Sequence, residues 1–215
     1  MKIKTLFVTN LPDYDGVVKL VESCDKYDID YDIIVCAWKG FFTKINEAYK
    51  RSVQIKNKYD YILFVDAHDV CFVGDFDNIR EYLECHLEYD CVFSTEKACW
   101  PASSLSGLYP ENKSDWKYLN SGSYLFKIDR FIDIIESNMP DIHCDDQLYF
   151  TQLLLSGKMN CKLDTECRLF QSLAHDDGSS FDVVDGKFQN VKTETFPVVL
   201  HGNGKSNLIF KYYGL

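Results

Sequence analysis

Apolar and polar positions change their period repeatedly along the first half of this chain. Short apolar runs rich in β-branched and aromatic residues predict strands, and apolar positions spaced three or four apart predict helices. The expected strands are residues 3–9, 32–37, 60–66 and 90–95. The expected helices between them are residues 17–27, 44–56 and 76–87. Strands that alternate with helices in this way predict a mostly parallel sheet with helices on both faces.

The second half of the chain is less regular. Residues 96–118 include two prolines and a glycine, so we expect a long loop there. The later expected elements are strands at 120–127 and 196–200 and helices at 128–139 and 146–156. No internal repeat, low-complexity segment or linker interrupts the chain. We therefore predict one α/β domain over residues 1–215, with a central, mostly parallel sheet flanked by helices.

Charge and composition narrow the classes of function. The formal net charge is −10 and no run of Lys or Arg occurs, which disfavours a nucleic-acid partner. An acidic protein still binds an anionic nucleotide when a divalent cation lies between them. Nine scattered cysteines with no Cys-X-X-Cys pair are typical of reduced, buried thiols rather than a zinc or redox motif. No stretch approaches the roughly 20 apolar residues of a membrane helix.

The clearest candidate for chemistry follows the expected strand at 60–66. Asp66 and Asp69 stand just beyond the carboxyl end of this strand, at the edge where open α/β sheets bind their ligands. Two hard oxygen ligands on a short turn suit Mn²⁺ or Mg²⁺ beside a diphosphate. The alternative is that both residues only form a turn or cap a helix. The pattern therefore predicts a divalent metal site and leaves the structural interpretation open.

Two further polar groups stand at the ends of expected elements. His201 ends the late strand and precedes Gly-Asn-Gly, whose glycines permit a close approach to phosphate. Asp145, Asp146 and Gln147 open an expected helix, where they suit either capping or contact with sugar hydroxyls. Neither pattern decides between a structural role and a functional one.

Two tryptophans lie where binding loops are expected. Trp38 follows the second expected strand, and Trp100 begins the long loop after the fourth. An exposed indole at a sheet edge suits stacking on a base or a sugar, and a buried indole suits packing. Both interpretations stay open for each residue.

Two other enzyme classes share parts of these patterns. His143, Asp145, His201 and Lys211 imitate the iron site of 2-oxoglutarate oxygenases, but those enzymes need a jelly roll and not strand–helix alternation. Asp66 after a strand also resembles the phosphatase nucleophile, but that pattern needs a second Asp where His68 stands. Both alternatives are therefore disfavoured.

Six ordered segments resemble a known family. They are FVDAHDV (64–70), FSTEKACWP (93–101), YLNSGSYLF (118–126), DDQLYFTQLLL (145–155), CRLFQSL (167–173) and VVLHGNG (198–204). Together they resemble the glycosyltransferase domain of the procollagen lysyl hydroxylases, over roughly residues 3–214. The resemblance implies a GT-A fold, which is a Rossmann-like nucleotide-diphospho-sugar transferase, with Mn²⁺ and a UDP-sugar. The family usually has Tyr at the position of His68.

The resemblance also implies functions for individual residues. The implied Mn²⁺ ligands are Asp66, Asp69 and His201. The residues implied around the UDP part of the donor are Thr9, Trp38, Lys44, His68, Asn203, Gly204 and Lys205. Those implied around the donor sugar and its reacting carbon are Asn120, Asp145, Asp146 and Gln147. Those implied to face the acceptor are Glu96 and Trp100.

The implied reaction moves glucose from UDP-glucose to galactosyl-hydroxylysine of collagen or a collagen-like protein, with retention of configuration. We expect attack on the same face as the departing UDP, with Asp145 and Asp146 positioning the sugar; one of them as a nucleophile is the alternative. Two further alternatives keep the fold: galactose transfer from UDP-galactose to hydroxylysine, and a module that binds UDP-sugar or collagen without turnover.

The resemblance bears on assembly and compartment as well. Members of the family often form dimers, so it allows a homodimer. Residues 1–9 do not resemble a signal peptide. Together with the many thiols, this favours a soluble protein of a microbial or viral-host cytosol.

Overall fold

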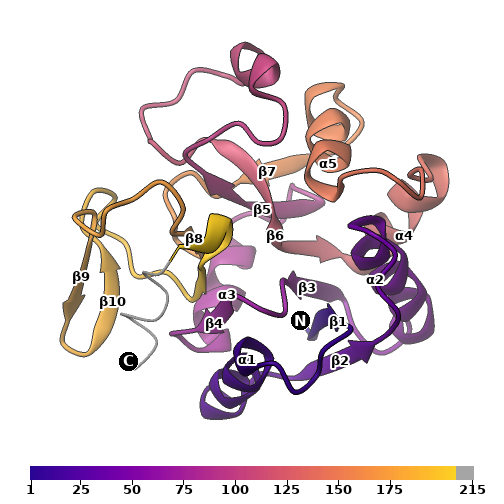
Figure 1. Ribbon diagram of the computed structural model, residues 1–215, viewed down its shortest axis with the longest axis horizontal. Helices are drawn as coiled ribbons and strands as arrows, with labels where there is room; N and C mark the ends of the chain where they lie inside the picture. Colours follow the sequence, from indigo (N-terminus) through magenta and orange to yellow (C-terminus); the bar gives the residue numbers. More distant parts are fainter. Residues whose placement is uncertain (207–215) are drawn as a thin grey trace.

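The computed structural model describes residues 1–206 and has at its centre a six-stranded sheet with the order β2-β1-β3-β6-β5-β7 (Figure 1). Its strands are β1 (Ile3–Thr9), β2 (Tyr31–Val35), β3 (Tyr61–Val65), β5 (Cys91–Glu96), β6 (Tyr118–Lys127) and β7 (Cys161–Leu163). The pairs β1–β2, β1–β3 and β5–β7 are parallel, and β6 runs antiparallel to β3 and β5. The predicted mostly parallel sheet is confirmed.

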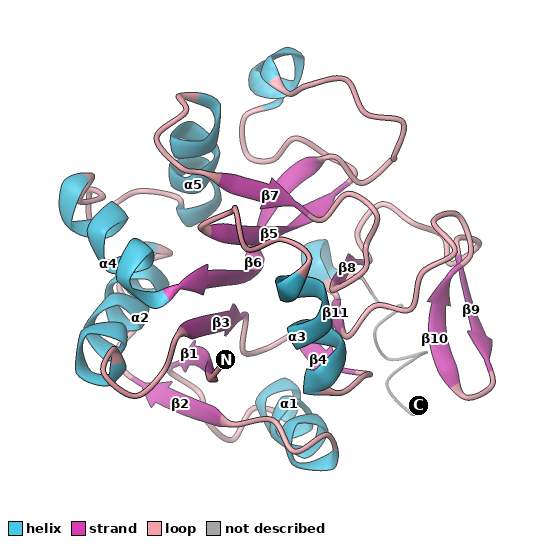
Figure 2. Ribbon diagram, turned by 180° about the vertical axis from the view of Figure 1, so that it is seen from behind, coloured by secondary structure: helices cyan, strands magenta, loops and turns pink. Residues whose placement is uncertain are grey.

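Helices cover both faces of this sheet. They are α1 (Asp15–Lys26), α2 (Phe42–Ile55), α3 (Phe76–Glu84), α4 (Ile128–Ser137) and α5 (Asp146–Leu155). Figure 2 shows α2, α4 and α5 on one side of the sheet and α1 and α3 on the other. Strand β3 shows why both faces need cover. Leu63 and Val65 point into one core and Ile62 and Phe64 into the other, because successive side chains of a strand point to opposite faces.

A second, three-stranded sheet has the order β4-β11-β8. Its strands are β4 (Val70–Phe72), β8 (Phe170–Ser172) and β11 (Val199–His201). Strand β11 is antiparallel to β4, with His201 paired to Val70, and parallel to β8. This register places the end of β11 beside the turn that carries Asp66 and Asp69.

The remaining short elements lie in the second half of the chain. A hairpin of β9 (Phe181–Val184) and β10 (Lys187–Asn190) turns at Asp185 and Gly186, both with positive φ, as a two-residue turn of type I′ requires. Two short 3₁₀ segments in the described residues are η1 (Ser103–Leu108) and η2 (Asn203–Lys205). In the described part of the chain, no helix combines the length and the apolar character needed to cross a membrane.

The structure corrects several predicted boundaries. Strand β11 covers 199–201 and not 196–200, α3 ends at Glu84, and the expected loop at 96–118 contains η1. The sequence did not predict β4, β7, β8, β9 and β10. Three of these strands have three residues each, which is too short to show a period, and their existence depends on partners distant in the chain.

Candidate active site

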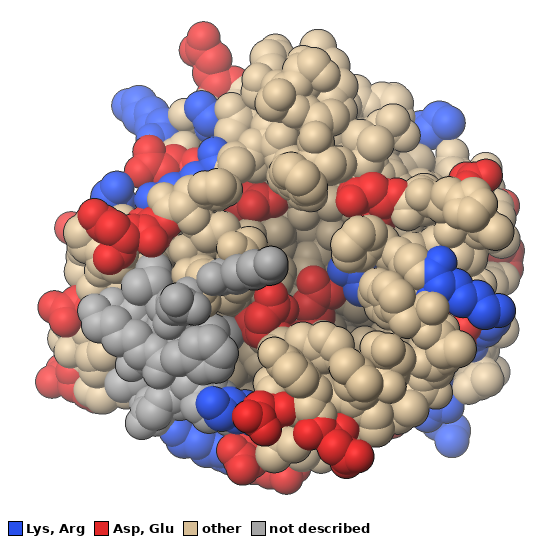
Figure 3. Space-filling view, viewed as in Figure 1, with Lys and Arg blue, Asp and Glu red and all other residues tan. Residues whose placement is uncertain are grey.

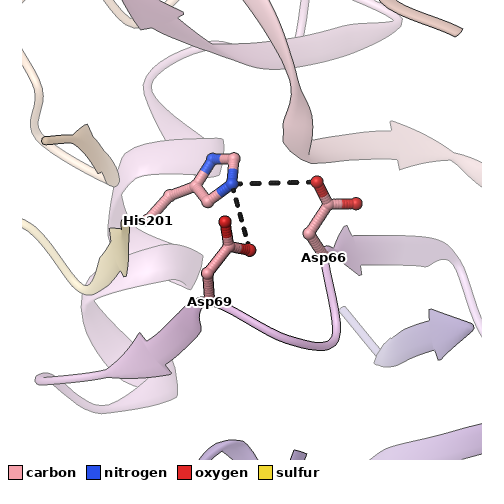
Figure 4. A group of neighbouring side chains, drawn as sticks. All are labelled: Asp66, Asp69 and His201. Carbon is pink, nitrogen blue, oxygen red and sulfur yellow. Dashed lines mark ion pairs between the residues drawn. The ribbon is translucent and has the colours of Figure 1, made fainter. Parts of the chain in front are cut away.

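Three potential metal ligands converge at the junction of the two sheets. Asp66 follows β3, Asp69 precedes β4, and His201 ends β11 (Figure 4). One ligand atom from each lies within 4.8 Å of the other two. His201 Nε2 is 3.4 Å from Asp69 Oδ1 and 3.7 Å from Asp66 Oδ2. Two carboxylate oxygens and one imidazole nitrogen are a donor set that suits Mn²⁺.

The ammonium group of Lys44 in α2 lies beside these potential metal ligands and contacts Asp66. Its Nζ lies 2.9 Å from Asp66 Oδ1 and 2.7 Å from Asp146 Oδ2. Asp146, the first residue of α5, also accepts a hydrogen bond from Ser121 Oγ at 2.9 Å. Among these contacting groups, three carboxylates (Asp66, Asp69 and Asp146) and one ammonium leave two negative charges when His201 is neutral. That excess matches the charge of one divalent cation.

The pKa directions follow from this crowding. Burial raises the pKa of Asp66, although Lys44 and His201 oppose the shift. Burial also acts to raise the pKa of Asp69, but attraction to His201 outweighs it, so this pKa lies below its ordinary value. For His201, burial lowers the pKa, and attraction to Asp69 and Asp66 outweighs it to give a net rise. Burial likewise acts against the charge of Lys44, but Asp146 and Asp66 raise its pKa overall.

Glu96, at the end of β5, is the centre of a buried group of amides. Its Oε1 accepts from Gln147 Nε2 at 2.6 Å and from Asn120 Nδ2 at 3.3 Å, and its Oε2 accepts from Asn203 Nδ2 at 2.9 Å. Only 4% of Glu96 is exposed, and burial raises its pKa against the effect of the Gln147 and Asn120 hydrogen bonds. These amides come from β6, α5 and η2, so Glu96 ties three elements together.

Two adjoining cavities meet at the metal-ligand candidates. A cavity of about 430 Å³ is lined by all six residues predicted around the sugar and the acceptor: Glu96, Trp100, Asn120, Asp145, Asp146 and Gln147. Asn203 and Gly204, which were predicted at the UDP part, line this cavity as well. A cavity of about 340 Å³ is lined by Thr9, Trp38 and His68, among others. Both cavities include Lys44, Asp66 and Asp69. Figure 3 shows acidic side chains in the hollow at the centre of this face.

A larger cavity, of about 880 Å³, lies elsewhere, between α3 and the segments that follow β7 and β10. None of the predicted site residues lines it. Its one buried carboxylate, Asp164, accepts from the backbone N–H groups of Arg168, Leu169 and Phe170 at 2.8–3.0 Å. Asp164 therefore holds a turn, and chemistry is concentrated at the smaller pair of cavities.

The cavity of about 340 Å³ is lined by aromatic rings and polar side chains. Trp38 is 41% exposed and its ring meets that of Phe41 edge-on, with centroids 6.0 Å apart. Thr9 Oγ1 lies 3.0 Å from His68 Nε2, and the ring of Tyr14 lies 5.0 Å from that of His68. His68 occupies the position where the family usually has Tyr, and the ring of Tyr14 lies beside it.

At the rim of the larger of the two cavities, Trp100 is 65% exposed, while its backbone oxygen accepts from Gln147 Nε2 at 2.9 Å. Asp145 caps α5 by accepting from the Leu148 N–H at 2.9 Å and also lines the cavity, so its structural and functional interpretations are compatible. The backbone of Lys205 belongs to η2; its side chain and all of Lys211 lie outside the described part of the chain.

Several residues at the site were not predicted. Ser121 and Gly122 continue β6 beyond Asn120, and Phe41 and His175 line the cavity as well. The adjacency of Ser121 and Gly122 to a predicted site residue in the segment Asn-Ser-Gly was the available signal. Phe41 and His175 gave none, since a lone aromatic residue in a loop carries no pattern.

The oxygenase alternative is not favoured. The fold is a mostly parallel sheet covered by helices and not a jelly roll. His143 is exposed, and among the residues that the structure describes the potential metal group is Asp66, Asp69 and His201, without His143.

Comparisons with known proteins agree with this geometry. Residues 3–215 match the PLOD GT domain family. A procollagen-lysine,2-oxoglutarate 5-dioxygenase of Drosophila melanogaster is 34% identical, over 99% of this chain and 32% of its own length. A multifunctional procollagen lysine hydroxylase and glycosyltransferase of Caenorhabditis elegans is 31% identical, over 93% of this chain and 30% of its own length. Protein R699 of Acanthamoeba polyphaga mimivirus is 30% identical, over 92% of this chain and 45% of its own length. The chain thus spans less than half the length of these relatives.

Solved structures show the same fold at low sequence identity. A glycosyltransferase involved in glycosylation of the major capsid of PBCV-1 aligns with a TM-score of 0.56 and 10% identity, over 100% of this chain and 98% of its own. Mouse xyloside xylosyltransferase 1 aligns with a TM-score of 0.52 and 12% identity, over 95% of this chain and 98% of its own. These likenesses establish a GT-A-like fold, and the family match establishes membership: the chain belongs to the PLOD GT domain family of glycosyltransferases.

Proposed function

We propose that this domain is a Mn²⁺-dependent retaining glucosyltransferase that moves glucose from UDP-glucose to galactosyl-hydroxylysine of a collagen-like protein. The observation that carries the proposal is the meeting of two cavities at Asp66, Asp69 and Lys44. A nucleotide sugar has two bulky ends joined by a diphosphate. The cavity with Trp38 fits the uridine end, the cavity with Gln147 and Asp146 fits the sugar, and the junction fits the diphosphate with its metal.

The donor set fits the metal. Asp66, Asp69 and His201 supply hard oxygen atoms and an imidazole within reach of one ion. With His201 neutral, as a metal ligand is, the local excess of two negative charges matches one divalent cation. When bound there, Mn²⁺ supplies Lewis-acid stabilisation to the departing diphosphate. Lys44 adds a fixed positive charge at the same junction, held in place by Asp66 and Asp146.

The two acidic residues at the start of α5 suit positioning better than nucleophilic attack. Asp146 Oδ2 is engaged by both Lys44 Nζ and Ser121 Oγ, which stabilise its negative charge and reduce its nucleophilicity. Asp145 Oδ1 is engaged as a helix cap. We therefore favour attack by the acceptor hydroxyl on the face from which UDP departs, with both carboxylates stabilising positive charge at the anomeric carbon. A glycosyl adduct trapped on Asp145 or Asp146 would contradict this mechanism.

A donor-by-acceptor panel tests the proposed reaction. UDP release is measured with UDP-glucose and UDP-galactose, each with hydroxylysine and galactosyl-hydroxylysine peptides, with and without Mn²⁺. We expect the highest rate for UDP-glucose with the galactosylated peptide, and loss of turnover when chelator removes the metal. A preference for UDP-galactose and hydroxylysine would replace the proposed substrates. Binding of UDP-glucose without turnover on any acceptor would identify a binding module.

Asp66→Ala tests the metal site directly. We expect activity to fall by at least about 1,000-fold because one of three ligands is lost, which removes several kcal/mol of charge stabilisation. Folding should be nearly unchanged because Lys44 keeps its ion pair with Asp146. Activity and thermal unfolding are measured on the same preparation. Retained turnover together with a much lower melting temperature would show that Asp66 is structural.

A further inference from the structure

The hydrogen bonds of Asn120 determine which nitrogen of His201 carries a proton. The backbone N–H of Gly122 donates to Asn120 Oδ1 at 3.0 Å, and a backbone N–H can only donate. This contact identifies the atom as the amide oxygen and fixes the orientation of the amide group. The same oxygen lies 3.1 Å from His201 Nδ1. Since an amide oxygen only accepts, His201 Nδ1 must carry a hydrogen.

The opposite nitrogen of His201 is the one that faces the acidic residues. Nε2 lies 3.4 Å from Asp69 Oδ1 and 3.7 Å from Asp66 Oδ2. With the proton of the neutral ring on Nδ1, the lone pair is on Nε2 and points toward the proposed metal position. Histidine ligands of metals are commonly oriented in this way by an acceptor at the far nitrogen.

Glu96 holds the other end of the Asn120 amide. Asn120 Nδ2 lies 3.3 Å from Glu96 Oε1 and 3.3 Å from Gln147 Oε1. Gln147 Oε1 is itself identified as oxygen by the Ser121 N–H at 3.2 Å, and its Nε2 donates to Glu96 at 2.6 Å. Every group that contacts Glu96 here is a donor, so the carboxylate serves as a common acceptor and needs no proton. The amide groups around it are held in one arrangement.

We propose that Glu96 and Asn120 are positioning residues for the metal: they hold the imidazole of His201 with Nδ1 protonated and Nε2 free to bind the ion. This inference rests on the proposed metal site and gives both residues a function beyond the contacts with acceptor and sugar that the resemblance implies. The connection runs through buried groups only, since Glu96, Asn120 and His201 are each no more than 4% exposed.

The first test observes the ring itself. Two-dimensional ¹H–¹⁵N spectra of the metal-free protein report the protonation of each histidine nitrogen, and comparison with His201→Gln assigns the signals. We expect Nδ1 of His201 to carry a proton in the wild type, including at a pH high enough to make the ring neutral. In Asn120→Ala we expect the neutral ring to move its proton to Nε2, where Asp69 accepts it. A wild-type ring with its neutral proton on Nε2 would overturn the inference without any variant.

The second test measures Mn²⁺ affinity in the presence of UDP by calorimetry. Loss of such an orienting contact typically weakens metal binding by about 10–100-fold, which we expect for Asn120→Ala. Glu96→Gln tests the second residue. A glutamine there has one acceptor oxygen and cannot accept from Asn120, Gln147 and Asn203 at once, so we expect the Mn²⁺ affinity to fall, by less than in Asn120→Ala. Wild-type affinity in Glu96→Gln would remove Glu96 from the proposal.

The outcomes separate the two proposals. If Asn120→Ala keeps both the protonation of Nδ1 and the wild-type Mn²⁺ affinity, the positioning role is wrong while the metal site stands. If the wild type with UDP does not bind Mn²⁺, the proposed function fails, and this inference fails with it; the wild-type titration alone identifies that case.

Discussion

The absence of a side chain at Gly122 leaves room for two of the proposed metal ligands. A Cβ atom there would lie 2.0 Å from His201 Cε1 and 2.9 Å from Asp66 Oδ2. Both distances are far below van der Waals contact. The absent side chain therefore leaves the space in which two proposed metal ligands approach β6.

Gly122→Ala should displace His201 or Asp66. We expect Mn²⁺ affinity in the presence of UDP to fall at least about 10-fold, and the free energy of unfolding to fall by about 1–3 kcal/mol, as for other overpacked sites. Calorimetric titration and urea unfolding measure the two effects. Gly107→Ala is the matched control because nothing lies within 4 Å of a Cβ built there. Wild-type affinity in Gly122→Ala would show that the ligands are not held where the structure has them.

At the scale of elements, an ion pair fastens the loop after β8 to the end of β5. Lys97 follows β5, and its Nζ lies 2.6 Å from Asp176 Oδ2 and 4.5 Å from the ring centroid of Trp116. Asp176 also accepts from the Gly178 N–H at 2.7 Å. Burial acts to raise the pKa of Asp176, but these hydrogen bonds and the Lys97 charge outweigh it and lower the pKa. The pair therefore positions the loop that brings His175 to the cavity of about 430 Å³.

Asp176→Asn tests this contribution and its pH dependence. At neutral pH we expect the free energy of unfolding of the variant to be about 1–3 kcal/mol lower than that of the wild type, as for the loss of hydrogen bonds to a charged group. Because the folded-state pKa is lowered, the contribution is present above the unfolded carboxyl pKa of about 3.9 and disappears as the pH falls toward the folded value. The wild type and the variant should therefore converge in acid.

Urea unfolding at neutral pH and below pH 4 measures the difference. Asp133→Asn serves as the control because its carboxylate is mostly exposed and its contact to Arg130 is long, at 3.7 Å. We expect this control to change stability by less than about 0.5 kcal/mol at either pH. If the difference in unfolding free energy between the wild type and Asp176→Asn became larger in acid, the lowered pKa of Asp176 would be wrong.

At the scale of the whole molecule, the site joins segments that are distant in the chain. Asp66 and Asp69 stand between β3 and β4, whereas His201 belongs to β11 in the second sheet. A metal bound by all three connects the large sheet to the small one. Binding should therefore stabilise the whole fold and not a single loop.

Thermal unfolding tests this expectation. At a constant, saturating UDP concentration, Mn²⁺ at about 100 times its dissociation constant stabilises the folded state by about 2.7 kcal/mol relative to UDP alone. At 2–4 °C per kcal/mol for a chain of this size, the melting temperature should rise by roughly 5–11 °C. Asp66→Ala should show a much smaller shift under the same conditions. An equal shift in the variant would place the metal elsewhere.

The sequence by itself determined the framework. The large-sheet strands β1, β2, β3, β5 and β6 and the helices α1 to α5 of residues 1–206 were predicted because each is long enough to show its own period. The carboxyl ends of the parallel strands meet at one edge, so Asp66 and Asp69 were predicted beside a ligand site. Capping by Asp145 or Asp146 was one of two interpretations, and the structure places Asp145 at the cap.

Only the tertiary structure decided how the site is assembled. Strands β4, β8 and β11 have three residues each and exist because they pair with one another across long stretches of chain. That pairing, and not any local pattern, brings His201 to Asp69. The amide orientations around Glu96 and the space left by Gly122 also depend on contacts between separate elements, and a single sequence carries no local record of such contacts.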